Sequence, residues 1–175
     1  MDIKDIPADI ERDHVDALLD TLHGLPVDLE VEGIIDRIAG LDRRVRRSME
    51  ETLAEFDLTH GEFKVLGWLR HGPHSPGELA ANAELSSGAM TNRIDQLERA
   101  GLVERTPDPS DRRGIQVTAT QKGLDLWLTA FAAQAEKEKF FASTLSADEK
   151  RELNAMLRRL MITLENHVPG DDPAC

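Results

Sequence analysis

Two adjacent arginines, Arg112 and Arg113, lie between two short strand-like runs and could bind phosphate. Arginine is a planar, permanently charged fork that suits phosphate groups and the negative potential of a narrow minor groove. Pro107 and Pro109 precede the pair, and we expect them to stop strand pairing and stiffen the tip. Asp111 can pair with one arginine and fix its direction. The alternative is an ordinary solvated turn.

A second polar group falls on one face of a helix that we expect to begin after Ser86, a good N-cap residue. Met90, Ile94 and Leu97 recur at spacings of four and three, which predicts a buried apolar face. Gly101 follows, where a left-handed C-cap favours glycine. The opposite face carries small or hydrogen-bonding residues: Ser87, Gly88, Thr91, Asn92 and Asp95. Such a face could enter a DNA major groove, although any amphipathic surface helix has a polar face.

The neighbouring segments predict the elements that position these residues. Residues 102–105 and 115–118 are alternating, partly β-branched runs, typical of a hairpin. Upstream, Ser75 opens a capping box with proline at the first helical position, and residues 62–69 form an apolar-periodic helix. We therefore expect residues 58–120 to form one compact unit of three helices and a hairpin, a winged helix-turn-helix.

These motifs resemble the MarR family of bacterial transcriptional regulators, over about residues 34–164. The most specific part is the segment 111–123, which is similar to the family's wing signature, with Ala119 in place of the usual leucine. The resemblance implies a mainly α fold with a small β-hairpin wing and a helical dimerisation region. It also implies an obligate homodimer, palindromic double-stranded DNA and, often, a small ligand that weakens DNA binding.

We expect Asp111 to orient the wing and a larger group of residues to bind DNA. These are Ser75, Ser86, Ser87, Gly88, Thr91, Asn92, Arg93, Arg112 and Arg113.

An additional helix within residues 7–25 is similar to the extra first helix of the family's urate-responsive subgroup. Its predicted face carries Ile10, His14, Ala17, Leu18, Thr21 and Leu22. That subgroup uses a tryptophan, an acid and an arginine, where this chain has Leu22, Lys64 and Arg93. Because lysine replaces the acid, we expect a small anionic or aromatic ligand such as a carboxylate, with Trp68 also at the site, rather than urate. Alternatively, Arg93 binds phosphate and Lys64 is solvated.

The flanking segments predict a dimerisation scaffold. Apolar stripes with helical spacing run through residues 34–56, 124–131 and 153–164, and they offer more apolar surface than one short domain covers. Packing within one chain as a bundle is the alternative. The predicted organisation is residues 1–57 for N-terminal helices and dimerisation, 58–120 for DNA binding, 121–167 for C-terminal dimerisation helices and 168–175 for a flexible tail.

The composition excludes several classes of protein. The 175 residues are 40% hydrophobic, and no apolar run approaches the roughly 20 residues that span a bilayer. With no secretory signal and a single cysteine, Cys175, we expect a cytoplasmic location. We also expect no membrane association, cofactor, metal site or enzymatic activity, because no phosphate loop, nucleophile elbow or ligand cluster is evident.

The formal net charge of −12 is unusual for a DNA-binding protein. The first 36 residues hold eleven acidic and two basic residues, so −9 of that charge lies outside the winged unit. Local charge governs association with DNA more than the total does. Two interpretations remain, a ligand-responsive DNA-binding regulator, most simply a repressor, and a winged-helix protein-interaction module that has lost DNA binding. Arginines on a stiff tip favour the first.

Overall fold

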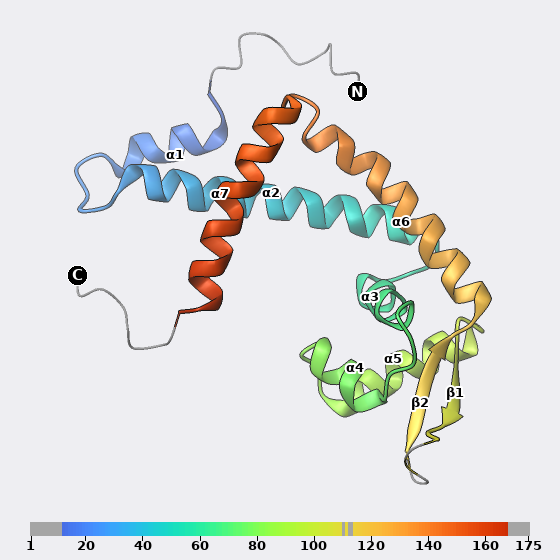
Figure 1. Ribbon diagram of the computed structural model, residues 1–175. Helices are drawn as coiled ribbons and strands as arrows, with labels where there is room; N and C mark the ends of the chain where they lie inside the picture. Colours follow the sequence, from blue (N-terminus) through green and yellow to red (C-terminus); the bar gives the residue numbers. More distant parts are fainter. Residues whose placement is uncertain (1–11, 110, 112–113, 168–175) are drawn as a thin grey trace. The chain divides into compact units, whose positions relative to one another are not determined.

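The computed structural model describes residues 12–109, 111 and 114–167. Within these residues the chain forms seven α-helices and one two-stranded sheet (Figure 1). Their contacts divide into two units, residues 12–137 and residues 138–167. The predicted fold class, mainly helical with a small hairpin, is confirmed.

The first unit contains the helices α3 (His60–Leu69), α4 (Pro76–Asn82) and α5 (Ser87–Arg99). Each begins at a hydroxyl N-cap, Thr59, Ser75 or Ser86, whose oxygen accepts a backbone N–H of the first turn. Their apolar faces meet in one core. Its largest fully buried apolar side chains include Leu53, Leu66, Leu79, Met90, Ile94, Leu97 and Val117.

The wing consists of β1 (Val103–Pro107) and β2 (Ile115–Ala119), which pair antiparallel. The expectation that both prolines stop pairing is wrong at Pro107, which pairs with Ile115. Asp108 N donates to Gly114 O at 3.0 Å, so the adjacent Pro107 pair is a non-hydrogen-bonded one, and the N–H that proline lacks is not needed. Arg112 and Arg113 lie outside the described residues.

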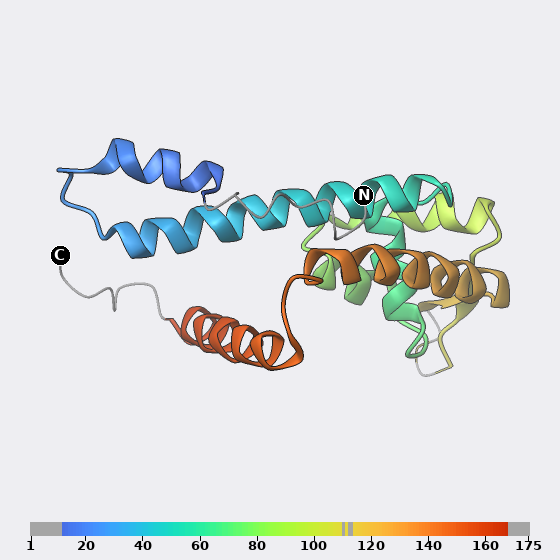
Figure 2. The ribbon, with the colours of Figure 1, turned by 90° about the horizontal axis from the view of Figure 1, so that it is seen from above.

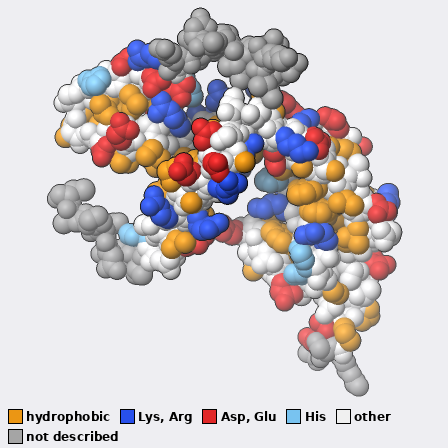
Figure 3. Space-filling view, turned by 45° about the horizontal axis from the view of Figure 1, so that its top comes forward, with side chains coloured by type: hydrophobic (Ala, Val, Ile, Leu, Met, Phe, Trp, Pro, Cys, Tyr) orange, Lys and Arg blue, Asp and Glu red, His pale blue; other side chains and the backbone are white. Residues whose placement is uncertain are grey.

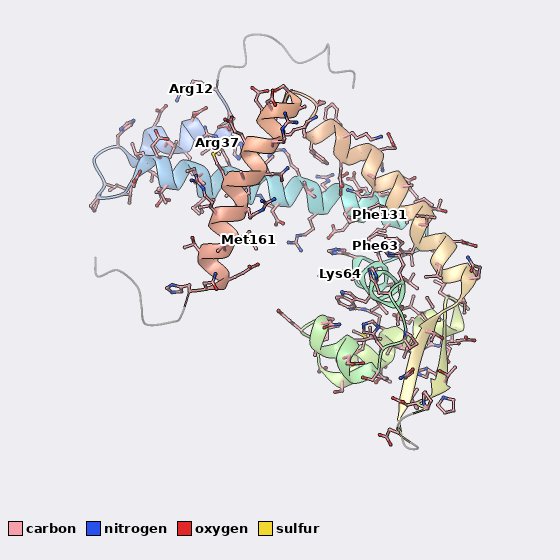
Figure 4. The ribbon with its side chains drawn as sticks, viewed as in Figure 1. Arg12, Arg37, Phe63, Lys64, Phe131 and Met161 are labelled. Atoms are coloured by element: carbon pink, nitrogen blue, oxygen red, sulfur yellow. The ribbon has the colours of Figure 1, made fainter. Side chains whose placement is uncertain are left out.

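The N-terminal helices are α1 (His14–Leu22) and α2 (Leu29–Ala54), and α1 lies alongside the first half of α2 (Figures 1 and 2). Arg37 joins them through ion pairs with Asp13 at 2.9 Å and Asp16 at 2.6 Å; Figure 4 labels this arginine. Two glycines of α2 allow α1 to pack closely against it. A Cβ at Gly33 would lie 3.3 Å from a methyl of Leu19, and one at Gly40 would lie 3.5 Å from the His14 ring.

The face predicted for α1 is not the side that the helix buries. Val15, which was not on that face, is the only buried residue of the helix, whereas Leu18 is 41% exposed. The face is set by contact with α2, which the spacing of apolar residues within α1 does not report. Ile10 of the predicted face lies outside the described residues.

The C-terminal helices are α6 (Gln121–Phe141) and α7 (Ala147–Glu165), and α7 begins with a capping box at Ser146. In α6, Trp127 stacks between Phe63 and Phe131, with centroid distances of 5.6 and 5.1 Å; both phenylalanines are labelled in Figure 4. The apolar stripe of α7 is exposed along the described helix: Leu153, Met156, Leu157, Leu160, Met161 and Leu164. None of the described helices has the length and hydropathy needed to cross a membrane.

Candidate nucleic-acid interface

The exposed face of α5 is the centre of the candidate interface. Met90, Ile94 and Leu97 are buried on one side of the helix. The opposite side is exposed and includes four of the residues predicted to bind DNA: Ser87, Gly88, Thr91 and Asn92. The exposed face also continues through Gln96 and Arg99, which we did not predict although their spacing from Asn92 could have revealed them.

The two N-cap serines, Ser75 and Ser86, differ in whether their hydroxyl hydrogen is free to be donated to a partner. Ser86 Oγ accepts from Ala89 N at 3.3 Å, so its hydroxyl hydrogen can still be donated to a partner. Ser75 Oγ accepts from Glu78 N at 3.2 Å and also donates to Glu78 Oε2 at 2.9 Å. Bonds from the Ser75 backbone and hydroxyl lower the pKa of Glu78, which keeps that carboxylate charged. The predicted DNA contact of Ser75 through its hydroxyl would therefore disrupt the cap.

An ion-pair cluster joins α5 to the wing. Arg105 of β1 pairs with Asp95 at 2.5 Å and also with Glu98, both on α5. Burial lowers the pKa of Arg105, but its hydrogen bonds to these two carboxylates outweigh burial and raise the pKa overall. Asp95 was placed on the polar face of α5 that could enter the groove, and its carboxylate is paired with Arg105 of the wing. The cluster positions the wing relative to the exposed face of α5.

The C-terminal end of α5 is held by the start of α6. Lys122 Nζ donates to Ala100 O at 2.7 Å, and Thr120 Oγ1 donates to Gly101 O at 2.8 Å. Gly101 has a φ of +70°, as a left-handed C-cap requires, and confirms the predicted helix end. Gly123 packs against the wing connection so closely that a Cβ there would lie under 3.0 Å from Leu102 O. The start of α6 therefore contacts the winged unit directly through these hydrogen bonds and through the packing of Gly123.

Arg93 does not join the exposed face of α5. Its guanidinium lies over Gly61 at the start of α3, where a Cβ would come well under 3.0 Å from three guanidinium atoms. The residue is half-buried, whereas the neighbouring Asn92 is exposed. The predicted DNA contact of Arg93 is therefore not supported by this conformation, because the side chain packs toward α3 and away from the groove-facing surface.

Three of the predicted ligand residues lie close to one face of α3. Lys64 and Trp68 follow Gly61 by three and seven residues, so they share its side of the helix. Lys64 Nζ is 6.0 Å from the Trp68 ring centroid, and Figure 4 labels Lys64. Burial lowers the pKa of the adjacent His60, and the charges of Lys64 and Arg46 lower it further. Several cationic groups thus gather at the first turn of α3.

Leu22 does not belong to this group within one chain. It ends α1, beside the beginning of α2, whereas α3 follows the end of α2. The 26 residues of α2 span about 39 Å. Within one chain the structure therefore places Lys64, Trp68 and Arg93 at α3 and leaves Leu22 apart from them.

Comparison with known proteins identifies the family. The model of the MarR family matches residues 58–115, the winged unit. The HTH-type transcriptional repressor Mb2911 of Mycobacterium bovis is 30% identical over 138 residues, which cover 78% of this chain and 97% of the relative. The chain belongs to the MarR family. It is also similar to the HTH-type transcriptional regulator PecS of Dickeya dadantii, at 29% identity over 146 residues, covering 80% of this chain and 88% of PecS.

Solved MarR-family structures have the same fold. Wild-type apo MarR from Escherichia coli matches with a TM-score of 0.63 at 29% identity, covering 71% of this chain and 94% of that one. A mutant of MarR complexed with operator DNA matches with a TM-score of 0.62 at 29% identity, covering 77% and 99%. This MarR-family chain is thus of the DNA-binding, winged helix-turn-helix class, whose members are transcription regulators and not enzymes.

Proposed function

We propose that the protein is a homodimeric transcriptional repressor that binds palindromic double-stranded DNA and releases it when a small anionic metabolite binds. The observation that carries this proposal is the exposed polar face of α5, held beside the wing by Arg105. A helix face of this kind suits the major groove, while a neighbouring wing can reach the backbone or the minor groove. The repressor name of the M. bovis relative supports the direction of regulation.

Two elements would make the DNA contacts. Ser87, Thr91 and Asn92 would meet base edges and phosphates in the major groove. Arg112 and Arg113, which lie outside the described residues, would bind the backbone or the minor groove from the wing tip. Most of the net charge of −12 comes from residues that precede the winged unit in sequence, and local charge governs association with DNA more than the total does.

The homodimer would bury apolar surface that one chain leaves exposed. Along residues 31–45, α2 exposes Val31, Ile34, Ile35, Ile38, Leu41 and Val45, and hydrophobic side chains reach the surface of the α1–α2 pair (Figure 3). Near the end of α2, Thr52 and Leu53 of the same broad face are buried. We propose that residues 1–57 and 121–167 form the dimer and residues 58–120 bind DNA, so that two-fold symmetry matches a palindrome.

The anion would bind at the first turn of α3. Lys64 and Arg93 come from two helices, and Trp68 offers a flat apolar surface beside Lys64. A carboxylate can accept charge-assisted hydrogen bonds from both cations. Since Arg93 is on the helix that would contact DNA, an anion that pulls its guanidinium would shift α5 and change the spacing of the two recognition helices. DNA requires that spacing to be near one helical turn, about 34 Å.

DNA binding is tested by fluorescence anisotropy with duplexes from the region upstream of the protein's own gene. Arg113→Ala should weaken DNA binding by about 1–3 kcal/mol. The affinity should also depend less steeply on salt concentration, by the amount expected for the loss of about one phosphate contact. Lys150→Ala on α7 is the control and should bind as the wild type does. Equal affinities for wild type and Arg113→Ala would contradict the wing contact, and a wild type that binds no duplex would favour the interaction-module alternative.

Ligand response is tested by adding small di- and tricarboxylates, or urate, to the preformed complex. Consider a ligand that binds about 100-fold more tightly to the dimer whose recognition helices are wrongly spaced for DNA. It shifts the equilibrium between the two dimer conformations by about 2.7 kcal/mol, enough to release an operator. Carboxylates should release DNA, urate should act weakly, and Lys64→Ala should blunt the carboxylate response without changing DNA affinity. Release by micromolar urate with carboxylates inert would refute the proposed anion class.

A further inference from the structure

Gly88 has no side chain, and no contact among the described residues requires its absence. Of the eleven glycines in the described residues, three have positive φ, and seven would bring a Cβ within 4 Å of another group. Gly88 alone combines an ordinary backbone with open space around the missing Cβ. It lies in the first turn of α5, as the second residue of the helix, and a helix gains nothing intrinsically from glycine in place of alanine. The missing side chain leaves open space at the exposed surface of α5.

Thr91 adjoins Gly88, three residues further along the same exposed face. Its Oγ1 donates to Ser87 O at 2.8 Å, within the helix itself. With its hydroxyl hydrogen used internally, Thr91 offers a partner its methyl group and the acceptor capacity that remains on Oγ1. Thr91 was predicted to bind DNA, and this bond leaves its hydroxyl no hydrogen to donate to a base acceptor.

The nearby charged groups are engaged elsewhere. Arg93 is turned over Gly61, and Asp95 is paired with Arg105. Gly88 and Thr91 together thus form a small notch without a free side-chain donor or a cation of its own. A notch of this composition suits a methyl group better than a phosphate or an acceptor atom on a base edge.

We propose that the notch formed by Gly88 and Thr91 reads a thymine through its C5 methyl group. Thymine is the base that presents a methyl group in the major groove, and a threonine methyl is a suitable contact for it. Gly88 provides the space in which the base approaches the helix, and the Thr91 methyl covers the side of the notch. This inference rests on the proposed DNA-binding function and adds to it one specified base per half-site.

The test begins by selecting a palindromic duplex from a random-sequence library with the full-length wild type. Each thymine is then replaced in turn by deoxyuridine, which removes only the C5 methyl. At one thymine per half-site we expect binding to weaken about fourfold, the value of burying one methyl-sized group. Replacing the symmetric pair should weaken binding about sixteenfold if both half-sites contribute equally.

Variants connect that thymine to the notch. Thr91→Ser keeps the hydroxyl but removes the methyl, so it should bind the thymine and deoxyuridine duplexes equally. Thr91→Val keeps methyl groups and should retain the discrimination. Gly88→Ala should unfold at the same or a higher temperature than the wild type, yet bind the selected duplex on the order of tenfold more weakly because its Cβ fills the notch.

Thr129→Ser is the matched control, because Thr129 Oγ1 of α6 makes the same bond, to Asp125 O at 2.8 Å, and is also exposed. It should discriminate thymine as the wild type does. The inference is overturned if no thymine is sensitive to deoxyuridine, if Thr91→Ser retains full discrimination, or if Gly88→Ala binds normally. A wild type that enriches no sequence would instead overturn the DNA-binding function on which the inference depends.

Discussion

Replacing Arg105 by methionine should loosen the wing while leaving the fold in place. Methionine retains much of the apolar stem but loses the guanidinium that pairs with Asp95 and Glu98. The two carboxylates are three residues apart on α5 and would then repel each other without a cation between them. Because Arg105 contacts carboxylates of its own chain, its effect on DNA binding would be one of position.

The solvent exposure of the three side chains sets the loss of stability expected for Arg105→Met. The Arg105 side chain is 23% exposed, while Asp95 and Glu98 are 38% and 41% exposed, so solvent screens both pairs. Exposed pairs contribute about 0.2–1 kcal/mol each, and a shared, partly buried arginine lies at the upper end. We expect Arg105→Met to lower the free energy of unfolding by about 1–2 kcal/mol.

The assay is urea unfolding followed by tryptophan fluorescence at fixed protein concentration, together with DNA anisotropy over a range of salt. With a urea m-value of about 2 kcal/mol/M, the midpoint should fall by about 0.5–1 M. DNA affinity should fall while the slope against salt concentration stays unchanged, since no phosphate contact is lost. The difference in unfolding free energy between the wild type and Arg105→Met should become smaller in 1 M salt, where the Debye length is about 3 Å.

Arg151→Met is the control, because Arg151 pairs with Asp148 on α7 at a more exposed position. It should change the unfolding free energy by less than about 0.5 kcal/mol and leave DNA affinity unchanged. The reasoning is refuted if Arg105→Met matches this control in both assays. A reduced salt slope in Arg105→Met would instead show that Arg105 contacts phosphate directly.

Three further predictions concern other parts of the chain. Leu157→Asp should place an unpaired charge in the proposed dimer interface and split or unfold the dimer, and a wild type that sediments as a monomer at micromolar concentration would refute the idea. Because the pKa of His60 is lowered from 6.5 in the folded state, the unfolded chain binds protons first, so stability should fall as pH drops below about 6.5. Between pH 5 and 8 the urea midpoint of His60→Asn should change less with pH than that of the wild type. Identical pH profiles for the two proteins would count against this linkage. Gly123→Ala should cost about 2 kcal/mol or more in urea unfolding because its Cβ meets Leu102 O, so a neutral effect would contradict the packing described.

Features with local causes could be predicted from the sequence. Ser75, Ser86 and Ser146 cap helices within three residues of themselves, and Gly101 adopts the left-handed conformation that its position after a helix favours. The wing strands and the apolar face of α5 followed from short periodic patterns in the same way. The resemblance to the MarR family was also visible, because the segment after Asp111 carries it in consecutive residues.

The directions of individual side chains depended on partners distant in sequence. Asp95 lies on the polar side of α5, yet Arg105 captures it, and Arg93 turns to α3 because Gly61 leaves space there. The buried side of α1 was likewise decided by its contact with α2. Sequence periodicity tells which face of a helix is apolar, but it does not tell which element covers that face. The sequence by itself therefore determined the secondary structure, the family and the DNA-binding class. The tertiary structure decided which polar groups remain available to DNA, because only the folded chain shows which of them are already satisfied by one another.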